Sequence, residues 1–154
     1  MQTVYDKMEY CLAGADRQGQ NSFERIVAFL SDGSWRVRYA AAVALGDRRD
    51  PKAVEPLLKA LQKEIGEPLF SQPPLEGGAH AGSNSPFSVK FPEGTTEDTK
   101  EAWRRRGRLL QAICLALGSI GISSPEVLEI LHRLATDQGC DYGVRAAACK
   151  ALGQ

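Results

Sequence analysis

Apolar residues recur along the chain with the period of an α-helix. Three stretches carry apolar side chains at positions i, i+3, i+4 and i+7, a spacing that aligns all four on one helix face. The three sets are Phe23, Ile26, Val27 and Leu30; Val54, Leu57, Leu58 and Leu61; and Val127, Ile130, Leu131 and Leu134. Each set begins eight or nine residues after a glycine. The pattern predicts three amphipathic helices at equivalent positions of a repeat.

A second type of helix, rich in alanine, is predicted to alternate with the amphipathic ones. It is clearest in residues 37–46 and 144–153, which both begin Val-Arg and end Ala-Leu-Gly, and weaker copies stand at 109–118 and 1–14. A helical pair of about 32 to 35 residues that repeats along a chain is typical of an all-α solenoid. We expect the glycines at the ends of three copies to cap their helices in the left-handed conformation: Gly14, Gly46 and Gly118.

One segment departs from the repeat. Residues 66–94 hold five of the eight prolines and five of the fifteen glycines and have no helical period, which predicts a long irregular loop. Thr95 and Asp98 have the spacing of a capping box, so a helix is expected from about Thr96 to Leu117. One face of that helix would carry Trp103, Arg106, Leu109, Leu110, Ile113 and Leu117. Residues 66–100 are thus an insertion within a single domain of residues 1–154.

The insertion also contains candidate anchors for a partner. Phe87 and Phe91 are too apolar for a purely solvated linker, because exposed phenylalanines favour aggregation unless they are covered. The segment therefore either folds back over the helices or binds another protein. With Trp103, these two residues are the anchors that we expect in the second case.

Charge and composition exclude several classes of protein. The 19 Lys and Arg balance the 19 Asp and Glu, which argues against binding of nucleic acid or an anionic membrane through bulk charge. No stretch resembles a secretory signal or a membrane span. The four cysteines form no Cys-x-x-Cys pair, so reduced thiols and a cytoplasmic location are expected.

Cysteine and histidine positions do not suggest catalysis. Cys114 and Cys149 each stand four residues before a repeat glycine, where a small packed residue is expected, so only Cys140 is expected to be accessible. The two histidines, His80 and His132, belong to no His-Glu pair, and neither a metal site nor a cofactor is expected. Because no motif supplies a nucleophile or an acid/base pair, we expect no enzymatic activity.

The arginines allow two interpretations. They gather as Arg36, Arg38, Arg48 and Arg49 and as Arg104, Arg105, Arg106 and Arg108, and such clusters could bind phosphates. The alternative is local pairing: Glu101 precedes two of them by three and four residues, a helical ion-pair spacing. Asp32 and Asp137 likewise precede Arg38 and Arg145 at repeat junctions. Zero net charge favours the local pairs.

The second repeat carries a family resemblance. The run from Val37-Arg38 to Ala44-Leu45-Gly46, followed by Asp50-Pro51 and the amphipathic residues 53–61, resembles the HEAT repeat of the type first recognised in phycobilisome bilin lyases. The resemblance implies a right-handed α-α superhelix of about seven helices. It also implies a non-catalytic scaffold or adaptor that binds another protein on its concave face, where we expect Arg25, Glu55, Lys59, Lys63, Glu129, His132 and Arg133. Phosphate-backbone binding and an accessory role beside a bilin-lyase-like enzyme are the alternatives.

The last helix raises the question of what covers it. The sequence ends just after the alanine-rich residues 144–153, and solenoid ends need caps. Val144, Ala148 and Leu152 are therefore expected to leave an apolar face uncovered. That expectation predicts either self-association through this helix or a longer repeat array.

Overall fold

The computed structural model describes residues 3–13, 20–65, 93–121, 124–136 and 142–153. These residues form seven α-helices and one short 3₁₀ helix, with no strand among them, so the all-α fold class is confirmed. The elements are α1 (Val4–Ala13), α2 (Gln20–Phe29), α3 (Trp35–Arg48), η2 (Pro51–Ala53), α4 (Val54–Ile65), α5 (Glu97–Ile120), α6 (Pro125–Thr136) and α7 (Tyr142–Leu152).

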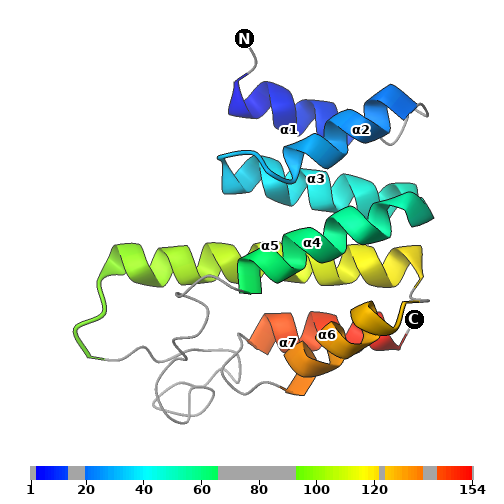
Figure 1. The fold of residues 1–154 in the computed structure, drawn as a ribbon. Helices are drawn as coiled ribbons and strands as arrows, with labels where there is room; N and C mark the ends of the chain where they lie inside the picture. The colour runs from blue at the N-terminus through cyan, green and yellow to red at the C-terminus, as the bar shows by residue number, and fades with distance from the viewer. Residues whose placement is uncertain (1–2, 14–19, 66–92, 122–123, 137–141, 154) are drawn as a thin grey trace.

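The helices form two layers (Figure 1). The alanine-rich helices α1, α3, α5 and α7 stack side by side, and α2, α4 and α6 lie across them in a second layer. In the stack, α3 packs against α1 and α5, and α5 packs against α7. The alternation of two helix types in the sequence therefore becomes an alternation of layers, as expected of a repeat whose units bury their apolar faces on one another.

The predicted apolar faces form the core between the layers. The twelve residues of the three sets are all buried or packed against the core, although Val27, Val54 and Ile130 are only partly buried. Alanines of α3 and α5 fill the space where these helices meet: Ala40, Ala41, Ala44, Ala112 and Ala116 are each less than 10% exposed. Small side chains bring helix axes close together, which accounts for the alanine content.

The prediction that the repeat glycines cap their helices was wrong. Gly46 lies inside α3, whose C-cap is Arg49 in the left-handed conformation with φ 53°. Gly118 lies inside α5, whose C-cap is Gly121 with φ 100°. Gly14 lies outside the described residues.

Close contact between helices explains why position 46 is a glycine. A Cβ atom added to Gly46 would stand 2.9 Å from both the Cα and the Cβ of Ala116, closer than two carbon atoms can pack. Because Ala116 belongs to α5, the glycine allows α3 and α5 to approach each other.

Helix α5 is the longest, with 24 residues. Its N-cap is Thr96, whose hydroxyl accepts a hydrogen bond from the Thr99 amide at 3.2 Å, so the cap lies one residue after the Thr95 of the expected capping box. The helix runs three residues beyond the expected Leu117. Figure 1 shows its N-terminal part extending past the ends of α3 and α7.

The C-terminal helix is better covered than the sequence suggested. Val144 and Ala148 are 0% exposed, because α7 packs against both α5 and α6. Leu152 is partly buried. These residues therefore do not form the uncovered apolar face that was expected, and self-association stays a prediction without their support. None of the described helices is long and apolar enough to cross a membrane.

Candidate functional site

Two grooves run along the sides of α4. The first, of about 570 Å³, lies between α2 and α4 and is lined by Val27, Leu30, Ser31, Lys52, Glu55, Pro56, Lys59, Ala60 and Lys63. The second, of about 490 Å³, lies between α4 and α6 and is lined by Pro51, Lys52, Val54, Glu55, Leu58, Lys59, Gln62, Ser124 and Glu126. Helix α4 makes its main backbone contacts with α5 in the layer behind it, so space remains on both of its sides.

Three predicted site residues lie at these grooves. Glu55, Lys59 and Lys63 are exposed on α4, and the first two line both grooves. Glu55 and Lys59 form an exposed ion pair at 3.5 Å. Among the described residues, Lys52 and Lys63 have no ion-pair partner. The grooves therefore combine an apolar lining with at least two available ammonium groups.

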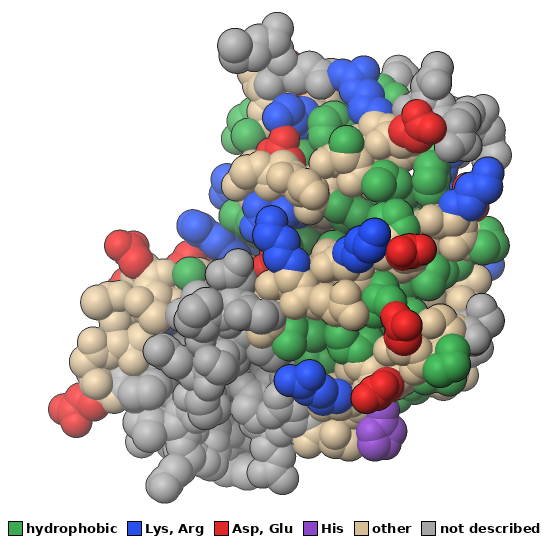
Figure 2. Space-filling model, viewed as in Figure 1, with side chains coloured by type: hydrophobic (Ala, Val, Ile, Leu, Met, Phe, Trp, Pro, Cys, Tyr) green, Lys and Arg blue, Asp and Glu red, His purple; other side chains and the backbone are tan. Residues whose placement is uncertain are grey.

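The other predicted site residues surround the grooves without lining them. Glu129, His132 and Arg133 are exposed on α6. Arg25 is exposed on α2, where its guanidinium carbon lies 4.5 Å from the ring centre of Tyr10 on α1. Figure 2 shows this layer from the front, with apolar, basic and acidic side chains interspersed. The face is mixed in character and not uniformly charged.

The expected anchors in the insertion fall into two groups. Phe87 and Phe91 lie outside the described residues. Trp103 is 5% exposed, so its ring is not an exposed contact, which argues against an anchoring role.

The buried carboxylate of Glu64 on α4 was not predicted from the sequence. The Glu64 side chain is 11% exposed; its Oε2 lies 3.3 Å from Arg106 Nε, and its Oε1 lies 3.6 Å from Arg38 Nε. The group links α4 to α5 and α3. A signal was present, because Glu64 follows Leu57 and Leu61 at helical spacing and so falls on the predicted apolar face. A charged residue at such a position indicates a buried partner of opposite charge.

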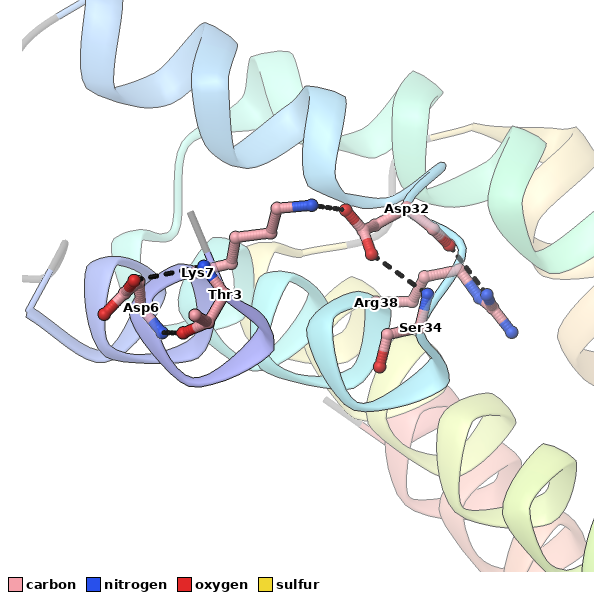
Figure 3. Close-up of polar contacts among 6 residues, drawn as sticks. All are labelled: Thr3, Asp6, Lys7, Asp32, Ser34 and Arg38. Carbon is pink, nitrogen blue, oxygen red and sulfur yellow. Dashed lines mark hydrogen bonds and ion pairs between the residues drawn. The ribbon is translucent and has the colours of Figure 1, made fainter. Parts of the chain in front are cut away.

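Asp32 joins the first two repeats (Figure 3). Its Oδ2 accepts a hydrogen bond from Lys7 Nζ at 2.6 Å, and its Oδ1 accepts one from the Ser34 amide at 2.9 Å. The hydrogen bond from Lys7 is the main cause that lowers the pKa of the carboxyl group below its usual value, followed by that from Ser34. The brace predicted between Asp32 and Arg38 exists in altered form, since Arg38 Nη1 donates to the Asp32 carbonyl at 2.8 Å. The corresponding Asp137 lies outside the described residues.

Several of the arginines have local partners. Glu101 pairs with Arg104 at 3.9 Å and with Arg105 at 3.4 Å, as the spacing predicted. Arg106 turns inward to Glu64. In the second repeat, Arg48 Nη1 donates to Ser22 Oγ at 3.2 Å, away from Arg38 and its contacts. Members of the two runs meet at Glu64 and, through Arg36 and Arg105, at Trp35. Pairing with carboxylates accounts for Arg38, Arg104, Arg105 and Arg106.

Two of the three described cysteines are buried thiols with a raised pKa. Burial raises the pKa of Cys11 to about 11, with a smaller contribution from Asp32, and burial raises the pKa of Cys114 to about 12. The expectation for Cys149 was wrong, because its side chain is exposed. Val144, Ala148 and Ala151 of the same helix are buried, so the Cys149 side chain lies off the packed face of α7. Cys140 lies outside the described residues.

The described residues contain no group of three or more His, Cys, Asp or Glu side chains that could hold a metal ion. His132 is exposed on α6, and His80 lies outside the described residues.

The layer formed by α2, α4 and α6 offers grooves, ammonium groups and apolar side chains for contact with another molecule.

Comparison with known proteins agrees with this architecture. No curated protein and no solved structure matches the chain. Residues 7–68 match the family model of HEAT repeats, and the matched segment contains most of α1 and the whole of α2, α3 and α4. The two layers of paired helices and this match together support a HEAT-repeat protein.

Proposed function

We propose that the chain is a non-catalytic, cytoplasmic adaptor that binds another protein on the layer formed by α2, α4 and α6. The observation that supports this most directly is the pair of grooves on α4, which share Lys52, Glu55 and Lys59. HEAT repeats commonly mediate contacts between proteins, and the matched residues include all three.

The chemistry of the grooves suits a protein segment. Val27, Leu30 and Pro56 supply apolar contact in the first groove, and Leu58 does so in the second. The lysines stand at the edges, where Lys59 is 73% exposed. An apolar centre with a polar rim is the usual anatomy of a protein interface. Glu129, His132, Arg133 and Arg25 extend the same layer beyond the grooves and complete the proposed surface.

An affinity capture from the native host, followed by titration of the purified partner, tests this function. We expect the triple variant Lys59→Ala, His132→Ala and Arg133→Ala to bind at least about tenfold more weakly, equivalent to about 1.4 kcal/mol. Arg49 is exposed and does not line either groove, so Arg49→Ala is the matched control and should bind normally. An unaltered affinity of the triple variant would contradict the assignment of this surface.

Capture with a chain in which a short Gly-Ser linker replaces residues 66–92, so that α5 and its N-cap Thr96 are kept, tests whether the insertion contributes. We expect the partner to be retained if the α4 grooves provide the main contacts.

The identity of the partner also tests the resemblance to the HEAT repeats of bilin lyases, because a bilin-carrying partner would support an accessory role beside a lyase-like enzyme. A titration with random duplex DNA at increasing salt covers the remaining alternative, because phosphate binding declines steeply with salt concentration.

A further inference from the structure

A third groove lies on the other helix layer, between α3 and α5. It has a volume of about 230 Å³ and is lined by Tyr39, Val43, Gly46, Asp47, Arg108, Gln111, Ala112, Leu115, Ala116 and Ser119. None of these residues belongs to α2, α4 or α6, so the proposed adaptor surface makes no use of this groove. The two surfaces can be tested independently.

Part of this groove is lined by small apolar groups. Gly46 and Ala116 meet there with no side chain larger than a methyl group between the helices. Tyr39 and Leu115 also line the groove and are 39% and 36% exposed. They are among the few large apolar side chains in the described part of the chain that remain so accessible, and they offer a site for one apolar side chain of a partner.

Aromatic and arginine side chains from both helices gather at one end. Trp35, which is partly exposed, packs edge-on against Tyr39 with ring centres 6.4 Å apart. The guanidinium carbon of Arg36 lies 5.5 Å from the Trp35 ring centre, and that of Arg105 lies 6.0 Å from it. Trp, Tyr and Arg are the residue types that contribute most to binding energy at protein interfaces.

The charges at this end are not balanced. Arg105 pairs with Glu101, whereas Arg36 and Arg108 have no acidic partner among the described residues. Asp47, the acidic side chain that lines the groove, belongs to the last turn of α3, far along the helix from Trp35. A ligand that complements the groove therefore carries carboxylates toward Arg36 and Arg108 and an apolar side chain toward Tyr39 and Leu115.

We propose that the α3–α5 groove binds an acidic peptide segment of a partner protein, anchored by one apolar side chain. The small number of unpaired arginines favours a peptide over nucleic acid, because phosphate-backbone binding relies on many cationic contacts. Among the described residues, this end of the groove has Arg108 in its lining and Arg36 beside Trp35. Asp47 would also repel a phosphate chain that followed the whole groove. Together with the α4 grooves, this site allows one chain to bind two partners on opposite layers.

The test is a selection of phage-displayed random peptides on the full-length chain, followed by fluorescence-anisotropy titration of the enriched peptides. We expect enriched sequences with Asp or Glu beside an aromatic or aliphatic residue. The double variant Arg36→Glu and Arg108→Glu should weaken their binding at least about tenfold, and peptides with Lys in place of the acidic residues should regain affinity for that variant. Leu115→Asp should weaken binding as well.

Two controls separate this proposal from folding defects and from the adaptor surface. Circular dichroism of the exposed variants should match that of the wild type, and the triple alanine variant of the α4 layer should bind the enriched peptides normally. The proposal is overturned if no acidic peptide is enriched or if the charge reversal leaves affinity unchanged. Binding of random duplex DNA that is lost in the Arg36→Glu, Arg108→Glu variant would also overturn it, in favour of a nucleic-acid site.

Discussion

At the scale of single residues, Asp32 shows how one side chain holds two repeats in register. Its carboxylate contacts Lys7 on α1 and the amide of Ser34 before α3, and its carbonyl accepts from Arg38 on α3. Lys7 and Asp32 are 27% and 14% exposed, so solvent screens their ion pair only partly. The position belongs to a turn, where hydrophobic periodicity carries no information.

The lowered pKa of Asp32 predicts a specific pH dependence of stability. A carboxyl group whose pKa is lower in the folded state contributes stability above its unfolded pKa of about 3.9, and this contribution is lost as the pH falls through the folded value. The free energy of unfolding, measured with urea at a series of pH values, should therefore decline more steeply in the wild type than in Asp32→Asn as the pH falls below about 5. A constant difference between the two proteins at every pH would contradict this.

Gly46 provides a second prediction at the residue scale. Alanine at this position would gain about 1 kcal/mol of helix propensity, but its Cβ would meet the backbone of Ala116 at 2.9 Å. Overpacking against backbone should outweigh the gain, so we expect Gly46→Ala to lower the free energy of unfolding by about 1 to 3 kcal/mol.

The matched control is Gly33→Ala, where nothing lies within 4 Å of the added Cβ and φ is not positive. That change should be neutral or slightly stabilising, by up to about 1 kcal/mol. Thermal denaturation of both variants distinguishes the two positions. Equal effects on the melting temperature would mean that α3 and α5 can move apart without a loss of stability.

At the scale of helices, Glu64 links three elements that are distant in sequence. Arg38 comes from α3 and Arg106 from α5, and both approach the same carboxylate of α4. Arg38 Nε and Arg106 Nη1 are buried without a hydrogen-bond partner. Removal of the Glu64 carboxylate would leave the Arg38 and Arg106 guanidinium groups in this partly buried site without the negative charge that offsets theirs.

We therefore expect Glu64→Ala to lower the free energy of unfolding by about 2 to 4 kcal/mol, somewhat less than for a fully buried pair. Glu55→Ala is the matched control on the same helix, because it removes an ion pair with Lys59 that is 77% and 73% exposed. Its effect should stay below about 1 kcal/mol. Urea denaturation of both variants provides the comparison, and similar losses would show that the Glu64 group is effectively solvated.

The positions of the helices could be predicted from the sequence, but the structural roles of single residues such as Gly46 could not. Periodicity located all three amphipathic helices, because burial of one face imposes the spacing, and the capping-box spacing located the start of α5. It did not distinguish Thr95 from Thr96 as the N-cap, since both have suitable side chains. Repetition also revealed that Gly46 is important, yet a repeated glycine can serve a turn or a close contact. Only the position of Ala116 on the neighbouring helix decides between them.

At the scale of the whole molecule, the sequence predicted the layers and part of one surface. Glu55, Lys59 and Lys63 could be placed together because they share one helix. The grooves could not be predicted, since each forms between elements of different repeats, and neither could the packing of Arg105 of α5 against Trp35 of α3. The insertion contributed Phe87 and Phe91 as candidates, and these stay predictions.

The contact between α3 and α5 also determines how the two halves of the chain are held together. The described residues before position 66 and after position 92 meet through the buried faces of α3, α4 and α5. A longer connection costs little, since each doubling of its length adds only about 0.6 kcal/mol of closure entropy. The two described parts of the fold are thus complementary, because each covers apolar helix faces that the other would expose on its own.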